Sequence, residues 1–183
     1  KKNGVPIVVK ADGLAAGKGV TICSSIEEAL KHTEEILNGK FKSSNQVVLE
    51  KFLKGDELSY FAIVDENSYK FFGSAQDHKK VGEKDTGLNT GGMGAYSPTY
   101  FSKTTIISET EELIIHPILR AFKDLEQPYT GFLYVSIMIV DNKPYVIEFN
   151  VRMGDPETQV VIPLMKSSLF NLLISTLENK INS

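Results

Sequence analysis

The sequence lacks the features that mark secreted and membrane proteins. Cys23 is its only cysteine, which excludes an internal disulfide and fits a reducing compartment. No apolar run approaches the about 20 residues that a membrane-spanning helix needs. The chain opens with Lys1, Lys2, Asn3 and Gly4 and enters a β-rich run, so we expect no signal peptide. A cytoplasmic protein outside the membrane is the expectation.

An excess of charge of one sign is also missing. The 20 basic and 23 acidic residues leave a net charge of −3, and no block of Lys and Arg stands out. Nucleic acid is therefore not an expected partner. With 183 residues, 42% of them hydrophobic, the chain is long enough for one globular domain or two small ones. Its abrupt start at Lys1 predicts that it is a fragment of a longer protein.

Glycine and lysine are concentrated between two β-rich runs near the N-terminus. The stretch contains Gly13, Gly17 and Gly19 together with Lys10 and Lys18. This order predicts a hairpin whose turn offers backbone N–H groups and positive charge to phosphate. The glycine spacing is not that of a P-loop, and the Ser or Thr for magnesium is missing. We expect a lid over a polyanion, with a surface turn carrying incidental lysines as the alternative.

The rest of the first third predicts a small α+β unit. Ser25 and Glu28 form a capping-box signature that opens a helix, and Gly39 ends it. A strand at residues 46–50 follows. Residues 5–50 therefore have the order strand, strand, helix, strand.

Residues 50–57 interrupt the β pattern between two strands. We expect a hinge whose free backbone groups suit a purine, while Glu57 suits the ribose hydroxyls. A solvated charged linker is the alternative. The stretch 73–100 shows little regular pattern, and its density of glycine and polar residues favours a functional loop over disorder. Within it, His78 beside Asp77 is a candidate acid/base pair, with a structural histidine as the alternative.

Helices are predicted at residues 105–122 and 168–178. The first should be bent or interrupted by Pro117. A third helix should begin after Gly154, with Asp155 as N-cap and Pro156 in its first position, which would place a helix N-terminus beside Arg152 for an anion.

A strand at residues 131–140 leads through a turn to a returning strand at 145–150. Strict alternation of side chains predicts two faces. One carries Val146, Glu148 and Asn150, and the other carries Tyr145, Ile147 and Phe149. A carboxylate and an amide carbonyl two residues apart suit magnesium bound to phosphates. Arg152 beside them can hold an anion. The alternative is a sheet face that is simply hydrated.

The motifs together resemble the ATP-grasp enzymes, and among them the phosphoribosylamine–glycine ligases, or glycinamide ribonucleotide synthetases. The stretches that carry the resemblance span nearly the whole chain: residues 9–20, 75–79, 89–98, 148–152 and 154–159. Leu88 stands where this family commonly has proline, and Met153 where it has phenylalanine. Both are apolar, so the departures concern loop stiffness and packing.

The resemblance implies an α+β ATP-grasp fold. Residues 1–53 would form its small β-β-α-β lid subdomain, and residues 54–183 its larger subdomain of antiparallel sheet with helices. The N-terminal and C-terminal domains of the full-length enzymes would be missing from this chain.

The implied activity is ATP-dependent ligation of glycine to 5-phosphoribosylamine through glycyl phosphate. The products would be glycinamide ribonucleotide, ADP and phosphate, in de novo purine (IMP) biosynthesis. The implied cofactors are ATP and Mg²⁺ or Mn²⁺, and the partners are small-molecule substrates. We expect the isolated chain to be inactive. Another ATP-grasp carboxylate–amine ligase of nucleotide synthesis and a non-catalytic ATP-binding module are the alternatives.

The resemblance also implies roles for the residues near the nucleotide. Lys10 and Lys18 would contact the ATP phosphates, and the loop from Gly13 through Gly17 to Gly19 would close over them. The adenine would be held by the residues of the hinge, and the ribose by its last carboxylate. These hinge residues are Glu50, the backbone of Phe52 and Leu53, and Glu57.

Roles follow in the same way for the reacting groups. Glu148 and Asn150 would hold the metal. Arg152 would stabilise the charge of the acyl phosphate, assisted by Lys18. His78, as a catalytic group, and Lys80 would supply further phosphate contacts.

Overall fold

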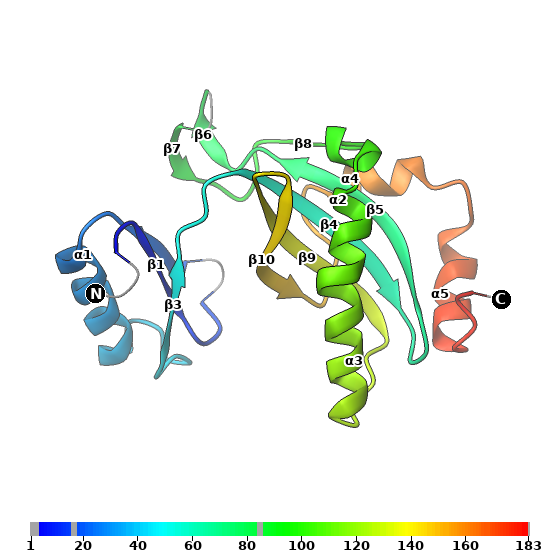
Figure 1. Ribbon diagram of the computed structural model, residues 1–183, viewed down its shortest axis with the longest axis horizontal. Helices are drawn as coiled ribbons and strands as arrows, with labels where there is room; N and C mark the ends of the chain where they lie inside the picture. The colour runs from blue at the N-terminus through cyan, green and yellow to red at the C-terminus, as the bar shows by residue number, and fades with distance from the viewer. Residues whose placement is uncertain (1–3, 16–17, 84–85, 183) are drawn as a thin grey trace. The chain divides into compact units, whose positions relative to one another are not determined.

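The computed structural model describes residues 4–15, 18–83 and 86–182. The chain divides into two compact units, Lys1–Lys54 and Gly55–Ser183. Both units combine antiparallel strands with helices, which confirms the predicted α+β class. Figure 1 shows the elements of each unit.

The first unit has the predicted order of strand, strand, helix and strand. Its elements are β1 (Ile7–Ala11), β2 (Val20–Cys23), α1 (Ile26–Glu35), a π-helical turn η1 (Ile36–Lys40) and β3 (Val47–Lys51). The strands pair antiparallel in the order β2-β1-β3 (Figure 1). The helix covers one face of this small sheet, where Val9, Cys23 and Ile36 are buried together. Cys23 is thus a packing residue.

The cap of α1 is close to the prediction. Ser25 accepts a hydrogen bond from the backbone N–H of Glu28 at 3.1 Å. The Glu28 carboxylate accepts in return from the N–H of Ser24, one residue before the N-cap, at 2.8 Å. The two bonds satisfy N–H groups that a helix start leaves without partners. Gly39, at φ +93°, ends the helical segment in the left-handed region.

The second unit is built on a five-stranded antiparallel sheet in the order β10-β9-β4-β5-β8. Its strands are β4 (Asp56–Val64), β5 (Tyr69–Asp77), β8 (Ala95–Tyr96), β9 (Gly131–Val140) and β10 (Lys143–Asn150). A separate hairpin joins β6 (Lys80–Gly82) to β7 (Thr86–Asn89). The helical elements are η2 (Tyr100–Lys103), α2 (Ile106–Thr110), η3 (Glu111–Ile115), α3 (His116–Asp124), α4 (Thr158–Val161), η4 (Ile162–Leu164) and α5 (Leu169–Leu177).

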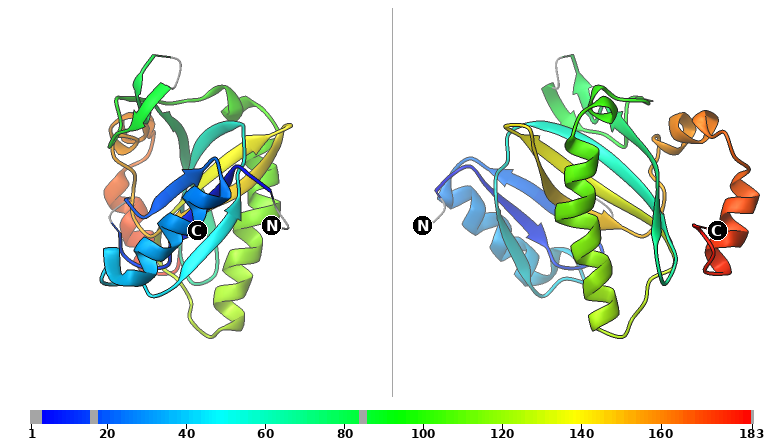
Figure 2. Two further views of the ribbon diagram at one scale, coloured as in Figure 1. Left: turned by 90° about the vertical axis from the view of Figure 1, so that its left-hand side faces the viewer. Right: turned by 45° about the vertical axis from the view of Figure 1, so that its right-hand side comes forward.

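The elements α2, η3 and α3 form one continuous rod across a face of this sheet (Figures 1 and 2). The rod corresponds to the helix predicted at 105–122. Its hydrogen-bond pattern changes to a π turn over Glu111–Ile115, directly before Pro117. A proline has no N–H to donate, so this change is where the predicted interruption occurs.

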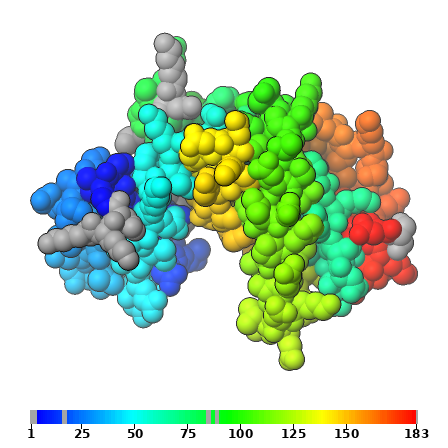
Figure 3. All heavy atoms as spheres, viewed as in Figure 1, coloured from blue at the N-terminus to red at the C-terminus, as the bar shows by residue number. Residues whose placement is uncertain are grey.

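The main core lies between the rod and the sheet. Ile114 and Ile115 from the rod pack on Tyr60 of β4 and on Val135 and Ile137 of β9, all of them buried. In Figure 3 the hairpin of β9 and β10 reaches the surface beside the rod. The sheet therefore has one face committed to hydrophobic packing.

The prediction of a long irregular loop at 73–100 was wrong in part. Strand β5 extends to Asp77, and Gln76 and Asp77 pair with Tyr96 and Ala95 of β8. The hairpin of β6 and β7 occupies much of the remainder. Pairing between segments some 20 residues apart stabilises these short strands, and local sequence pattern does not report such pairing.

Strict alternation along β10 was also wrong. The register with β9 shifts between Val146, opposite Ile137, and Glu148, opposite Ser136. This β-bulge at Ile147 inserts one residue and reverses the alternation. Val146 therefore shares a face with Phe149, and Tyr145 shares a face with Glu148 and Asn150.

The predicted helix start after Gly154 was wrong as well. Helix α4 begins at Thr158 and has four residues. The N–H of Thr158 donates to the carbonyl of Gly154 at 3.1 Å, which forms a turn ahead of the helix. The Asp155 carboxylate accepts from the side chain of Gln159 at 2.7 Å, and within the described part of the chain no backbone N–H donates to it. This single helical turn offers no N-terminal anion site of the predicted kind.

Other boundaries agree with the prediction. Asp141 and Asn142, with φ near +51° and +58°, form the tight turn between β9 and β10. Ser168 caps α5 by accepting from the N–H of Asn171 at 3.3 Å. Among the described residues no single helix is long and apolar enough to cross a membrane, and one bent pair, Thr158–Leu164 with Leu169–Leu177, reaches that length and composition only when both helices are combined.

We predict that Gly55→Ala destabilises the second unit. A Cβ at Gly55 would lie 1.9 Å from the carbonyl oxygen of Ile139, so the backbone must shift. The expected loss in the free energy of unfolding is about 1–3 kcal/mol, measured by urea denaturation. Gly91→Ala is the matched control, because nothing lies within 4 Å of its Cβ position. Equal stability of the two variants would contradict the close approach.

Candidate functional site

In the first unit, an ion pair links two residues predicted to contact nucleotide. Lys10 Nζ lies 2.7 Å from Glu50 Oε2, and the two side chains are 14% and 38% exposed. The register places Val8 opposite Glu50 and Lys10 opposite Val48, so Lys10 and Glu50 share one face of the small sheet. That face is the one not covered by α1, since Val9 points into the core.

The glycine loop after β1 is fastened to the loop before β3. The N–H of Asp12 donates to the carbonyl of Gln46 at 3.1 Å, and the Ser43 hydroxyl donates to the carbonyl of Leu14 at 2.7 Å. A Cβ at Gly13 would lie 2.3 Å from the carbonyl oxygen of Ser43. Gly13 therefore permits a close backbone approach, and the lid expected from the sequence is anchored at this end.

The first unit contains further residues that were predicted to contact the nucleotide. A Cβ at Gly19 would meet the Cβ of Ala15 at 2.6 Å, so Gly19 allows the loop to close tightly. Lys18 is exposed, and Phe52 and Leu53 are half-buried after the end of β3. Gly17 lies outside the described residues.

In the second unit, polar side chains gather on the sheet face opposite the helical rod. Residues directly opposite on antiparallel strands share a face. Ser136 of β9 lies opposite both Ser59 and Glu148, and Tyr134 lies opposite Asn150. We call this surface the polar sheet face; its polar residues are Glu57, Ser59, Asp77, Tyr134, Ser136, Glu148 and Asn150.

An ion pair between Glu57 and Lys79 links this face to the segment that follows β5. Lys79 Nζ contacts Glu57 Oε1, which also accepts a hydrogen bond from the Ser136 hydroxyl at 2.9 Å. Burial by itself would lower the pKa of Lys79, but the Glu57 carboxylate outweighs it and raises that pKa. Lys79 therefore stays charged, and Glu57 is held in place by two donors.

Asp77 is the least satisfied carboxylate of the polar sheet face. Its Oδ1 is buried and has no hydrogen-bond partner among the described residues. A Cβ at Gly92 would lie 3.0 Å from that atom, so the glycine loop at 91–94 covers it closely. Burial raises the pKa of Asp77, and the negative charge of Glu157 raises it further, against the opposing effect of Lys79.

Glu148 and Asn150 form a pair of oxygen-bearing side chains at the edge of the same face. Asn150 Nδ2 donates to Glu148 Oε1 at 3.1 Å. This bond uses the amide nitrogen, so the amide oxygen and the second carboxylate oxygen can still face a cation. The described residues hold no cluster of three or more His, Cys, Asp or Glu that would bind a metal by itself. The donor set therefore fits a hard cation that is shared with phosphate oxygens.

Three further predicted residues take no part in this ion pair. His78 is exposed and stacks on Tyr96, with ring centroids 5.8 Å apart. Lys80 is half-buried in the β6–β7 hairpin. Arg152 follows the end of β10, is exposed, and donates from Nη1 to the carbonyl of Met153 at 2.9 Å.

Sequence reasoning missed several members of this site. Lys79 was passed over in favour of Lys80, although Asp77 and Lys79 continue the period-two pattern of β5 beyond Ala75. Glu157 was treated as part of a helix start, yet its side chain is buried. No local signal in the sequence identifies Ser59 and Ser136, because their role depends on pairing between β4 and β9.

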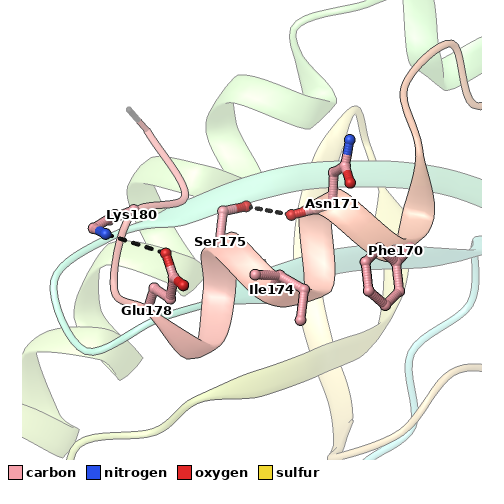
Figure 4. A pocket seen from close by; sticks show the side chains of 6 residues that line it. All are labelled: Phe170, Asn171, Ile174, Ser175, Glu178 and Lys180. Atoms are coloured by element: carbon pink, nitrogen blue, oxygen red, sulfur yellow. Dashed lines mark hydrogen bonds and ion pairs between the residues drawn. The ribbon is translucent and has the colours of Figure 1, made fainter.

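A shallow surface pocket of about 310 Å³ lies elsewhere in the second unit (Figure 4). Its lining residues come from α5 and the segment after it: Phe170, Asn171, Ile174, Ser175, Glu178 and Lys180. None of these residues belongs to the polar sheet face, and the pocket has no convergent set of reactive groups.

Comparison with known proteins supplies the family. A family model described as "Phosphoribosylglycinamide synthetase, ATP-grasp (A) domain" matches residues 1–158. The chain belongs to this family. Membership confirms the resemblance carried by the motifs and the expected ATP-grasp fold.

Individual relatives from this family support the same assignment. The chain is 47% identical over 175 residues to the phosphoribosylamine–glycine ligase of Chlorobaculum tepidum. This alignment covers 94% of this chain and 41% of that protein. The crystal structure of the Thermotoga maritima phosphoribosylamine–glycine ligase is similar at a TM-score of 0.89 and 36% identity, covering 97% of this chain and 46% of that one. The chain thus spans less than half the length of these synthetases.

A more distant likeness concerns the fold alone. The biotin carboxylase domain of a 2-oxoglutarate carboxylase from Hydrogenobacter thermophilus has a TM-score of 0.68 at 18% identity, over 97% of this chain and 37% of that one. The fold of this chain is therefore shared beyond its own family.

We predict that Asp77→Asn raises the melting temperature at pH 7. Because the pKa of Asp77 is raised in the folded state, its ionisation favours unfolding. The carboxylate therefore lowers the free energy of unfolding once the pH exceeds 3.8, the ordinary pKa of an aspartate side chain. The gain should shrink as the pH falls toward that value and vanish below it, where both the folded and the unfolded state are protonated. Asp56→Asn, at an exposed position on β4, is the matched surface control. A gain of the same size at pH 4 and pH 7 would contradict the assignment.

Proposed function

We propose that this chain is the ATP-binding part of a phosphoribosylamine–glycine ligase of de novo purine biosynthesis. In this reaction the glycine carboxylate takes the γ-phosphoryl group of ATP, giving glycyl phosphate and ADP. The amine of 5-phosphoribosylamine then attacks the acyl carbon and releases phosphate, which leaves glycinamide ribonucleotide. The observation that carries the proposal is the Glu148–Asn150 pair on the polar sheet face of a chain that belongs to this family.

Glu148 and Asn150 would hold Mg²⁺, or Mn²⁺, together with nucleotide phosphates. Their oxygens are of the kind that these ions prefer, and their exposed position leaves room for the phosphate ligands. When bound, the ion neutralises charge on the phosphates. The Hydrogenobacter biotin carboxylase domain was crystallised in complex with the magnesium salt of ADP, which is in keeping with such a site in this fold.

Residues of the first unit would contact the phosphates of ATP. Lys10 and Lys18 supply positive charge for the phosphates, and the loop of Gly13, Gly17 and Gly19 supplies backbone N–H groups. Lys10 already pairs with Glu50, so its orientation is fixed before the nucleotide arrives. Fixing a charge in advance reduces the ordering that binding requires.

The base and the sugar would be held by the segment that joins the two units. We assign the adenine to Glu50 and to the backbone of Phe52 and Leu53, and the ribose hydroxyls to Glu57. Lys79 and Ser136 both use Glu57 Oε1, so Oε2 is the oxygen that we assign to the ribose. A carboxylate held by two donors is a preorganised acceptor.

The acyl phosphate would be stabilised from the segment after β10. The guanidinium of Arg152 uses Nη1 for the carbonyl of Met153, and its remaining N–H groups can meet an anion. Lys18 would assist it, while His78 and Lys80 would add phosphate contacts. This chemistry depends on positioning and charge more than on a covalent nucleophile.

The rest of the ligase would complete the active site. The chain spans 41% of the Chlorobaculum relative. We propose that flanking domains carry most of the phosphoribosylamine site and that this chain alone does not complete ligation. The partners are then small molecules and those domains, without nucleic acid or membrane, and the cytoplasm is the place of action.

The test is glycine-dependent release of ADP by the complete ligase with Glu148→Gln. Loss of the carboxylate should lower the rate by about 100-fold, because a metal ligand is removed. Glu112→Gln, an exposed residue on η3, is the control and should leave the rate unchanged.

Two results would contradict the proposal. ADP release that responds to another small acid and not to glycine would indicate a different carboxylate–amine ligase. If the wild-type protein shows no turnover and the Glu148→Gln variant still binds ATP, the chain is part of a non-catalytic binding module.

A further inference from the structure

We propose that Glu157 is a positioning residue that holds the segment carrying Arg152 against the polar sheet face. This inference rests on the proposed function, because it concerns the guanidinium assigned to the acyl phosphate. The described part of the chain contains two carboxylates, Asp65 and Glu157, that are each 3% exposed. They are satisfied in different ways, and the difference indicates the role of Glu157.

Asp65 is satisfied within its own turn and by the C-terminal segment. It accepts from the backbone N–H groups of Asn67, Ser68 and Ile181 at 2.9, 2.7 and 3.1 Å. Burial opposes ionisation of Asp65, but these N–H donors prevail and lower its pKa. Such a carboxylate has a structural task, which is to fasten the turn between β4 and β5.

Glu157 has a different set of partners. Its Oε1 accepts from the hydroxyls of Ser59 and Tyr134 at 3.0 and 3.2 Å, and these two hydroxyls lie 3.0 Å apart. The three groups form a closed triangle that joins β4, β9 and the turn before α4. The described residues provide no salt bridge to Glu157. Burying a carboxylate without a cation is costly, and two neutral donors compensate only in part.

The other oxygen of Glu157 is close to the turn that follows Arg152. A Cβ at Gly154 would lie 2.4 Å from Glu157 Oε2, so the carboxylate packs directly on this glycine backbone. The carbonyl of Gly154 accepts from the N–H of Thr158, and Arg152 Nη1 donates to the carbonyl of Met153. The side chain of Glu157 thereby ties the segment 152–158 to the sheet.

Hydrophobic contacts support the same placement. Met153 and Val161, on either side of Glu157, pack in a cluster with Phe61 and Tyr134 on the polar sheet face. An apolar side chain at position 157 would fill this space without the cost of a buried charge. It would lack the hydroxyl contacts that determine where the turn lies along the sheet.

Displacement of the segment would affect the reaction more than binding. Glu157 precedes α4 and has no assigned contact with ATP. If it acts through Arg152, its loss should lower kcat and leave KM for ATP nearly unchanged. A displacement of about 1 Å in a reacting group can cost about 100-fold in rate.

The test is a double-mutant cycle on glycine-dependent ADP release by the complete ligase. Glu157→Met should lower kcat by about 10- to 100-fold in the wild-type background. In the Arg152→Ala background the same change should cost less than about 2-fold, because the group it positions is already gone. Glu157→Gln should stay within about 3-fold of wild type, since its amide oxygen can still accept from both hydroxyls.

Additive losses in the two backgrounds would overturn the inference, because they would indicate a general structural role. Equal losses in Glu157→Gln and Glu157→Met would also overturn it, since they would indicate that the charge is what matters. If Glu157→Met does not fold, Ser59→Ala combined with Tyr134→Phe removes the donors and should give the same pattern of non-additivity. If the wild-type ligase itself releases no ADP with glycine, the proposed function is wrong, and the inference that rests on it is wrong as well.

Discussion

The five-stranded sheet must bury one face, and the placement of the candidate site depends on that constraint. Tyr60, Val135 and Ile137 are removed from water under the helical rod. Burial of apolar area contributes about 25 cal/mol per Å², and a shift of one residue would turn the wrong side chains toward the rod. The register held in this way sets which residues occupy the opposite face. Glu57, Ser136 and Glu148 are on the polar sheet face as a consequence.

The polar sheet face concentrates negative charge around one lysine. Lys79 pairs with Glu57, while Asp77 and Glu157 are close enough for their charges to act on one another. Burial raises the pKa of Tyr134 to about 12, so its hydroxyl stays protonated and can donate to Glu157. Carboxylates held at a cost to stability are typical of functional sites. A cationic group, such as a metal ion near Glu148, would meet a favourable field on this face.

The sequence predicted the parts of the site that depend on local pattern. Glu148 and Asn150 are two residues apart on one strand, beyond the bulge, so their shared face follows from alternation alone. The bulge at Ile147, and the shared face of Ser59 and Ser136, depend on how strands from distant parts of the chain pair. The helix start was predicted at Asp155 and Pro156, because proline is common in the first helical position, whereas Glu157 is the residue that directly precedes α4. Its burial is decided by the hydroxyls of β4 and β9.

The most direct test of the central claim, that Glu148 and Asn150 hold the metal of a nucleotide site, is the position of Mn²⁺. Anomalous diffraction from crystals of the complete ligase, grown with Mn²⁺ and a non-hydrolysable ATP analogue, locates the ion without reference to activity. We predict a peak about 2.0–2.3 Å from a carboxylate oxygen of Glu148 and the amide oxygen of Asn150. Nucleotide-bound Mn²⁺ with neither side chain among its ligands would contradict the account.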